Sequence, residues 1–384
     1  MALLLGLFLL IQTGCDTIDA NGPETGTLEA EASRQTDARR AAGVVYTMTN
    51  DAAGNAVIAY GRAADGRLVA GRSFPTNGLG SGDGLNGTSN PLILSDDAMY
   101  LYAVNAGSND VAIFRRNGRN LDLRGTVPSG GERPVSVTTR GDLVYVLNVG
   151  GAEPGNIAGF RMVGGTLEHL VTRPLGAGQT DLPQIGFSPD GRFLVVTDKP
   201  TNTITTYVVD GSGVAGQPNT QTSSGQTPFG FAFTPDDVLI VSEAFGGGTD
   251  ASAASSYRIH ANGALEAISA VIPTTETAAC WAETTANGKF AYVTNTGSST
   301  VTGYAVAQDG SLSLLDASGE TGHTGAGSRP VDLAIAGNAF MYVHSKGTDT
   351  LTGFAIDAQT GALTPISGAT MSGLPASAVG VAAF

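Results

Sequence analysis

The chain has 384 residues, of which 41% are hydrophobic, so it holds enough apolar material to bury a substantial core. Its 34 acidic and 20 basic residues give a formal net charge of −14 at pH 7. Such acidity excludes the broad basic surface that nucleic-acid phosphates or anionic lipid head groups require, and we expect no nucleic-acid partner.

The first element in chain order is an apolar run from Ala2 to Ile11, followed by Gly14 and Cys15. The run is too short to span a bilayer and is typical of the hydrophobic region of a secretory signal. It resembles a bacterial lipoprotein signal, in which Cys15 would become the acylated first residue. Gln12 departs from that motif, which usually has an aliphatic residue there, and no Lys or Arg precedes the run. The alternative, a first strand of the fold, is disfavoured by the patternless stretch that follows.

Residues 16–42 are polar and charged and have no hydrophobic period, which predicts a flexible tether. We therefore expect a signal peptide over 1–15 and an exported protein, attached to a membrane through lipid on Cys15. Its location would be the periplasm or the cell surface of a bacterium. The second cysteine, Cys280, would then have no disulfide partner, and its place in an apolar strand predicts an inert, packed thiol.

From residue 43 onward, one order of elements repeats along the chain. Each copy has a proline, a short apolar strand, a turn with glycine, a strand of the Tyr-Val-x-Asn type, and a strand that ends in an aromatic residue. Asp-Gly pairs and 54 glycines indicate tight hairpin turns. Copies of about 43 to 52 residues with about four strands predict propeller blades. Their anchors are Pro91, Pro134, Pro183, Pro228, Cys280 and Pro330.

The two ends of the repeat region complement each other. The segment Gly43 to Tyr60 begins in the middle of a copy, without the proline-led strand, and the final segment Ser377 to Phe384 matches the missing strand. We expect the last strand to pair with the first and close the ring, which removes free sheet edges. The predicted fold is an all-β, seven-bladed β-propeller that forms a single, monomeric domain over residues 43–384.

Several phrases carry a family resemblance. The sequences "YVLN" at Tyr145, "YVTN" at Tyr292 and "SPDGRFLVV" at Ser188 resemble the YVTN-repeat propellers. The similarity is greater to the lactonase family, which includes 6-phosphogluconolactonase-like and carboxymuconate-lactonising propellers. The resemblance implies a site at the pore mouth, built from a His after the proline of a central blade, an Asp at the end of the next strand, an Arg-His pair after the following proline, and a Glu.

The match to that site is partial. Asp198 and Glu243 are present, but Gln184 stands where the resemblance implies His, and Phe229 with Gly230 stands where it implies Arg-His. The two carboxylates could act as catalytic acid and base, or as ligands of a divalent cation. The alternative for both is turn capping, because most other blades have Asn at this position. No other cofactor signature is evident. The expected ligand-binding residues at the mouth are Arg133, Gln184, Trp281 and Arg329.

Three functions follow as hypotheses. The first is a scaffold or binding propeller with a degenerate active site, which takes a small-molecule or protein ligand at the pore mouth. The second is a divergent lactonase or a lactone-forming, carboxymuconate cyclase-like enzyme that uses Asp198 and Glu243. The third, an electron-transfer propeller, is disfavoured because the sequence has no C-x-x-C-H haem attachment site.

Overall fold

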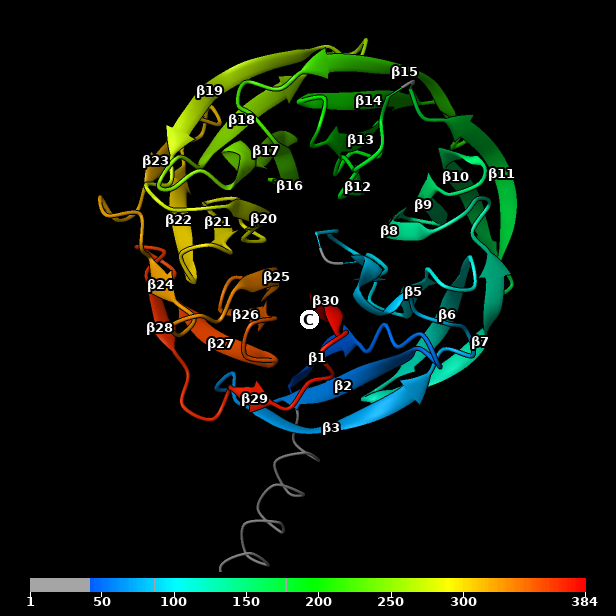
Figure 1. Ribbon diagram of the computed structural model, residues 1–384, viewed down its shortest axis with the longest axis horizontal. Helices are drawn as coiled ribbons and strands as arrows, with labels where there is room; N and C mark the ends of the chain where they lie inside the picture. The colour runs from blue at the N-terminus through cyan, green and yellow to red at the C-terminus, as the bar shows by residue number, and fades with distance from the viewer. Residues whose placement is uncertain (1–41, 86, 177) are drawn as a thin grey trace, which may run out of the picture.

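In the computed structural model, which describes residues 42–85, 87–176 and 178–384, the chain forms a ring of seven antiparallel sheets around a central channel (Figure 1). The prediction of an all-β, seven-bladed propeller is confirmed. The predicted signal segment 1–15, with Cys15, and all of the predicted tether except Ala42 lie outside the described residues. Within the described part of the chain, no helix has the length and apolarity needed to cross a membrane.

Each blade is a meander whose first strand borders the channel. From the channel outward, the first three blades are β30 (Val379–Ala383), β1 (Gly43–Met48), β2 (Ala56–Arg62) and β3 (Leu68–Pro75); β4 (Leu92–Leu94), β5 (Tyr100–Asn105), β6 (Asp110–Asn117) and β7 (Asn120–Pro128); β8 (Pro134–Arg140), β9 (Leu143–Gly150), β10 (Pro154–Val163) and β11 (Thr166–Pro174).

The other four blades follow the same order. They are β12 (Ile185–Phe187), β13 (Phe193–Asp198), β14 (Thr203–Val209) and β15 (Ala215–Thr222); β16 (Pro228–Phe233), β17 (Val238–Glu243), β18 (Ala253–Ile259) and β19 (Leu265–Pro273); β20 (Ala279–Thr284), β21 (Phe290–Asn295), β22 (Thr300–Val306) and β23 (Leu312–Leu314); β25 (Pro330–Ala336), β26 (Phe340–Ser345), β27 (Thr350–Ile356) and β28 (Leu363–Pro365). Short strands β24 (Gly322–His323) and β29 (Met371–Ser372) pair with β22 and β27, and two 3-10 turns are η1 (Gly82–Leu85) and η2 (Phe245–Gly247).

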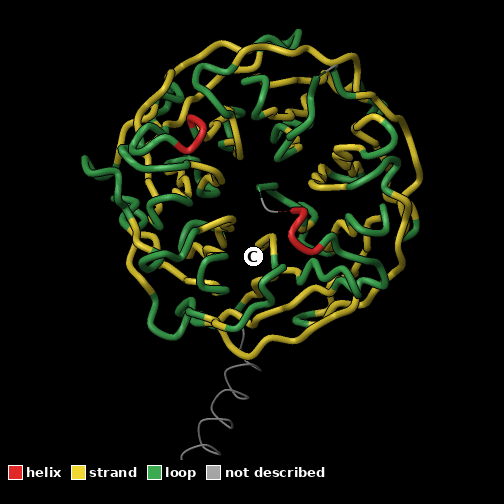
Figure 2. Tube along the Cα trace, in the orientation of Figure 1, coloured by secondary structure: helices red, strands yellow, loops and turns green. Residues whose placement is uncertain are grey.

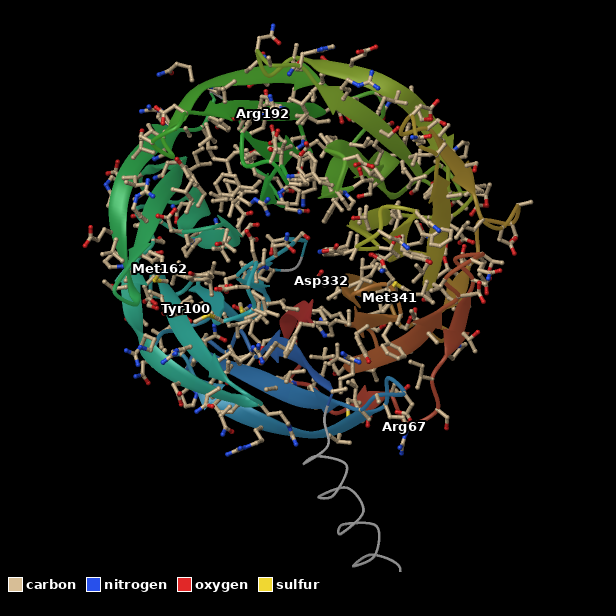
Figure 3. The ribbon with its side chains drawn as sticks, turned by 180° about the vertical axis from the view of Figure 1, so that it is seen from behind. Arg67, Tyr100, Met162, Arg192, Asp332 and Met341 are labelled. Atoms are coloured by element: carbon tan, nitrogen blue, oxygen red, sulfur yellow. The ribbon has the colours of Figure 1, made fainter. Side chains whose placement is uncertain are left out.

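Burial explains the strand patterns. Second strands such as β13 and β21 are buried along their whole length, because a neighbouring blade covers each face of the sheet. Outer strands such as β7 alternate exposed and covered residues, since one face meets water. The core therefore lies between the blades, as Figure 3 shows from behind with side chains drawn.

The ring closes as the sequence predicted. Strand β30 pairs antiparallel with β1, with Val45 opposite Ala383 and Met48 opposite Val379. The Arg62 guanidinium donates from Nη2 to the carbonyl oxygen of Phe384 at 3.1 Å. The last residues of the chain thus complete the first blade (Figure 1).

The tyrosine of the recurring Tyr-Val-x-Asn phrase makes a hydrogen bond to a glycine-containing turn of the next blade. Buried Tyr292 on β21 donates a 2.7 Å hydrogen bond to the carbonyl oxygen of Gly361, in the outer turn of the next blade. Gly361 has a φ of 73°, a conformation that glycine adopts without strain. Tyr145 and Tyr342 make the same bond at 2.7 Å, to turn glycines in the blades that follow them. The repeated phrase therefore encodes a contact between blades.

A long connection between β3 and β4 enters the middle of the ring (Figure 2). This β3–β4 loop, residues 76–91, includes η1 and buries Leu85 in the core. The backbone N–H of Ser89 donates to the carbonyl oxygen of Pro183 at 2.7 Å, on the opposite side of the channel. The loop therefore restricts the space at the end of the channel where the inner strands begin, which we call the mouth.

Candidate ligand-binding site at the channel mouth

The mouth contains a cavity of about 470 Å³. Its walls come from the starts of β16, β20 and β25, from the turns that follow β21 and β26, and from the β3–β4 loop. A volume of this size suits a small molecule. The lining residues are Gly87, Phe229, Cys280, Trp281, Thr296, Arg329, Val331 and Lys346, and we call this space the mouth cavity.

One wall of the mouth cavity is aromatic. The rings of Phe229 and Trp281, which begin two neighbouring inner strands, have centroids 4.9 Å apart at an interplanar angle of 53°. The Trp281 indole Nε1 donates a 2.9 Å hydrogen bond to the carbonyl oxygen of Thr88 in the β3–β4 loop. The polar atom of the indole is therefore satisfied, and the two rings form a fixed apolar surface.

Two cations line the mouth cavity, and a third contacts its aromatic wall. Arg329 and Lys346 both line the mouth cavity, and the Lys346 N–H donates to the Arg329 carbonyl oxygen at 3.1 Å. Lys199 Nζ lies 4.5 Å from the centroid of the Phe229 ring and 2.9 Å from Asp181 Oδ1. Among the described residues that line the cavity, two are cationic and none is a carboxylate. The mouth cavity is thus suited to a molecule that combines a ring or flat body with negative charge.

Cys280 also lines this cavity, as a buried thiol. Its Sγ lies 3.2 Å from the carbonyl oxygen of Ala278, and the side chain is 8% exposed. Burial raises the pKa of the thiol to about 11, so the reactive thiolate is scarce near neutral pH. These contacts favour the packed, inert role that the sequence predicts for Cys280.

Glu243, at the end of β17, lies in a hydrogen-bond network inside the protein. Its Oε1 accepts from the Gly225 N–H at 2.7 Å and from the Ser223 hydroxyl at 3.0 Å, while Oε2 accepts from the Ser255 hydroxyl at 2.8 Å. The side chain is fully buried, and this burial raises its pKa, although the hydrogen bonds oppose the shift. The carboxylate joins the segment before β16 to strands β17 and β18.

Asp198, at the end of β13, is also fully buried. The Thr201 hydroxyl donates to its Oδ2 across the turn that follows the strand. Burial raises the pKa of Asp198, and the Thr201 hydrogen bond partly opposes this. Neither Asp198 nor Glu243 lines the mouth cavity. The hydrogen bond from Thr201 to Asp198 is typical of a turn cap, the alternative that the sequence left open, whereas Glu243 connects separate segments of the chain.

The remaining two sequence-predicted residues lie elsewhere. Gln184 links two blades, because its Nε2 donates to the Phe231 carbonyl oxygen and its Oε1 accepts from the Phe231 N–H, both at 2.8 Å. Arg133 lines a separate cavity of about 410 Å³ together with Glu153. Of the six predicted residues, the structure therefore brings together Trp281 and Arg329 in one cavity.

The sequence interpretation missed three residues of this site. Phe229, Lys199 and Lys346 were not among the predicted ligand-binding residues, yet Phe229 and Lys346 line the mouth cavity and Lys199 contacts the Phe229 ring. A signal was present, since Phe229 is a departure from the family phrase and Lys199 directly follows Asp198. For metals, the described residues contain no group of three or more His, Cys, Asp or Glu side chains that could hold an ion.

Comparison with known proteins identifies the family. The sequence model described as "Lactonase, 7-bladed beta-propeller" matches residues 155–281 and 252–379, which together cover more than half of the chain. The chain therefore belongs to the seven-bladed β-propeller lactonase family. A search of curated proteins found no match.

Solved structures share the whole architecture. A protein from Lactobacillus plantarum is 21% identical with a TM-score of 0.67, and the match covers 89% of this chain and 99% of the other. A putative 6-phosphogluconolactonase from Bacteroides fragilis is 20% identical with a TM-score of 0.63, covering 89% and 98%. The periplasmic gluconolactonase of Pseudomonas aeruginosa is 19% identical with a TM-score of 0.63, covering 87% and 99%. At these identities the likeness establishes the fold.

Proposed function

We propose that this protein is a binding member of the lactonase family, which holds a small, ring-bearing anion in the mouth cavity and has little or no turnover of simple lactones. The observation that carries the proposal is the placement of Arg329 and Lys346 in one cavity with the Phe229 and Trp281 rings. Guanidinium and ammonium groups bind carboxylate or phosphate, and the aromatic faces cover the rest of the ligand.

The chemistry of the cavity supports binding over catalysis. Opening a lactone by water requires a general base near the carbonyl carbon and a donor where negative charge develops. Arg329 and Lys346 could serve as donors, but the Cys280 thiol has a pKa of about 11 and is a poor base at neutral pH in its protonated form. The carboxylates of Asp198 and Glu243 are engaged within the protein, outside this cavity.

A divergent lactone hydrolase is the second candidate, and membership of the lactonase family favours it. In that case Asp198 or Glu243 would need to leave its hydrogen-bond partners and reach the ligand. Hydrolysis of a panel of aldonolactones, with and without Mg²⁺ or Ca²⁺, separates the two functions. If the wild type hydrolyses a lactone and Asp198→Asn or Glu243→Gln does not, the enzymatic function is supported and the binding proposal is rejected.

Calorimetry with benzoate, glucuronate and inorganic phosphate tests the binding proposal directly. We expect at least one ring-bearing anion to bind, and Arg329→Gln or Lys346→Gln to weaken it roughly 10-fold or more, as the loss of one charged hydrogen bond does. Arg133→Gln is the matched control, because Arg133 lines a different cavity. Equal affinity in the wild type, Arg329→Gln and Lys346→Gln would contradict the proposal.

We further propose that the protein is exported and attached to a membrane by lipid on Cys15. The apolar run before Cys15 and the polar stretch after it support this location. A solved structure similar to this chain is described as periplasmic, which agrees with export. Labelled fatty acid should enter the wild-type chain and not Cys15→Ala, and a wild-type chain without label would contradict lipidation.

A further inference from the structure

The channel contains a second cavity, separate from the mouth. Two lobes of about 270 and 210 Å³ share the lining residues Asn90, Ile93 and Glu283, so we treat them as one channel chamber. The chamber and the mouth cavity have no lining residue in common. The β3–β4 loop contributes to both, with Gly87 at the mouth cavity and Asn90 at the chamber.

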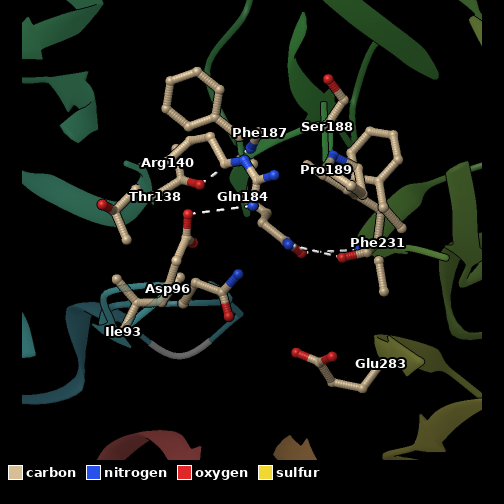
Figure 4. Close-up of a pocket in the computed structure, with 15 residues that line it drawn as sticks. Ile93, Asp96, Thr138, Arg140, Gln184, Phe187, Ser188, Pro189, Phe231 and Glu283 are labelled. Atoms are coloured by element: carbon tan, nitrogen blue, oxygen red, sulfur yellow. Dashed lines mark hydrogen bonds and ion pairs between the residues drawn. The ribbon is translucent and has the colours of Figure 1, made fainter. Parts of the chain in front are cut away.

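Glu283 on β20 points its carboxylate into this chamber (Figure 4). The chamber's described lining includes one cation, Arg140, whose Nη1 lies 3.2 Å from Asp96 Oδ2 in an ion pair. Glu283 forms no ion pair with a described residue that would compensate its charge. Burial raises the pKa of Glu283 to about 7, which reflects the cost of holding an uncompensated carboxylate there.

A second buried acid, Asp332, contacts Val381, a residue of the chamber wall. Asp332 on β25 is 3% exposed and accepts backbone N–H groups from Leu333 at 2.8 Å and Val381 at 3.2 Å. Figure 3 shows Asp332 near the centre of the ring. Burial raises the pKa of Asp332, and the negative charge of Glu283 raises it further.

The wall of the chamber also contains an unpaired hydroxyl. Thr139 lines the chamber and is 6% exposed, and its hydroxyl oxygen has no hydrogen-bond partner in the described part of the protein. This oxygen is enclosed by the wall and has almost no exposed area, so it does not face the open space of the chamber. Thr139 and Glu283 belong to different blades, β8 and β20, and both line the larger lobe.

The chemistry of these groups distinguishes between two kinds of cation. Calcium takes six to eight oxygen ligands and magnesium a near-octahedral set, whereas the described residues offer no group of three acidic, His or Cys side chains. An ammonium group needs one carboxylate and neutral acceptors for its three N–H donors. We propose that the channel chamber is a binding site for a small primary amine, whose ammonium group pairs with the Glu283 carboxylate.

Thermal shift and calorimetry on the full chain with ethanolamine and putrescine at pH 8 test this site. We expect saturable binding that raises the melting temperature, and at least a 10-fold loss of affinity in Glu283→Gln. Glu266→Gln is the matched control, because Glu266 is an exposed glutamate on the outer strand β19. Tetramethylammonium, which has no N–H donor, should bind more weakly than the primary amines.

Three results would overturn the proposal. The first is Ca²⁺ or Mg²⁺ binding that depends on Glu283 while the amines do not bind. The second is the absence of amine binding by the wild type at pH 8, whatever the melting temperature of Glu283→Gln. The third is amine binding that survives Glu283→Gln. We expect the amines to bind Arg329→Gln as tightly as they bind the wild type. That result would show that this site is independent of the mouth cavity.

Discussion

The indole nitrogen of Trp281 donates a 2.9 Å hydrogen bond to the carbonyl oxygen of Thr88, 193 residues earlier in the chain. This bond joins the sixth blade to the β3–β4 loop and fixes both at the mouth cavity. The loop contributes Gly87 to the mouth cavity and Asn90 to the channel chamber. One side chain therefore contributes to the aromatic wall and holds a loop that lines both cavities.

Trp281 is the single tryptophan of the chain, so its fluorescence should report on the mouth cavity. We expect a ring-bearing anion that binds there to change the intensity or wavelength of emission. Putrescine in the channel chamber should leave the emission nearly unchanged. A tryptophan signal that follows amine binding and ignores anion binding would show that the two ligands have been assigned to the wrong cavities.

Tyrosine hydroxyls on second strands should differ in their contribution to stability. Tyr292→Phe removes the donor to Gly361 and should lower the free energy of unfolding by about 1 kcal/mol. Tyr46→Phe is a matched control, since the Tyr46 hydroxyl is buried without a partner among the described residues, and should be neutral or stabilising. Equal effects of the two substitutions in denaturant unfolding would count against the contact between blades.

Glu243→Gln should lower stability and leave anion binding at the mouth intact. The carboxylate accepts from Gly225, Ser223 and Ser255, and an amide cannot accept at both of its polar atoms. We expect a loss of roughly 1 to 3 kcal/mol, the cost of one unsatisfied buried group. The melting temperature and the calorimetric affinity for the anion should be measured on the same variant. Unchanged stability together with lost anion binding would show that Glu243 belongs to the ligand site.

Glu283 should make stability depend on pH. Its pKa is about 7 in the folded protein against an ordinary 4.5, so between these values the folded state keeps a proton that the unfolded state has lost. The contribution of Glu283 to the free energy of unfolding is therefore complete below about pH 4.5 and is lost as pH rises through about 7. The nearby Asp332 carboxyl changes in the same direction, because its pKa is also raised.

Comparison of the wild type with Glu283→Gln isolates this effect. Glu283→Gln should be more stable than the wild type by roughly 1 to 3 kcal/mol at pH 8 and nearly equal to it at pH 4.5. The difference between the two proteins largely removes the opposite contribution of His344, whose pKa burial lowers to about 4. A difference that does not vary with pH would contradict the assignment.

Removing residues from Ser377 onward should destabilise the whole domain, because β30 is the inner strand of the first blade. We expect a loss of more than about 4 kcal/mol, which is large for any local change. A synthetic peptide of Ser377 to Phe384, added to the truncated protein, should restore part of the melting temperature. An unchanged melting temperature after truncation is incompatible with closure by this strand.

The fold was predictable because the sequence repeats the pattern of one blade several times along the chain. The half copies at Gly43 and Ser377 indicated the closing pair, and the structure confirms the pairing of β1 with β30. The hydrogen bond from Tyr292 to Gly361 was not predictable in the same way. It joins two different blades, and a period within the sequence shows only what one blade contains.

The site was less accessible to sequence reasoning. Gln184 was expected at the mouth, but it lines the channel chamber, where its amide links the start of one blade to Phe231 of the next. The position of the β3–β4 loop at the mouth could not be predicted, because its glycines and serines are typical of any loop. Glu283 is one acid in an inner strand, and its isolation from cations becomes visible only when all the surrounding blades are in place.

Because β30 closes the ring, the first blade can be completed only after the end of the domain has been synthesised. Strand β1 is among the first parts of the domain to leave the ribosome, and its inner neighbour is the last, more than 300 residues later. Throughout synthesis β1 therefore presents an unpaired edge, a recognised starting point for aggregation. A premature stop before Val379 would leave this edge of β1 unpaired for the lifetime of the protein.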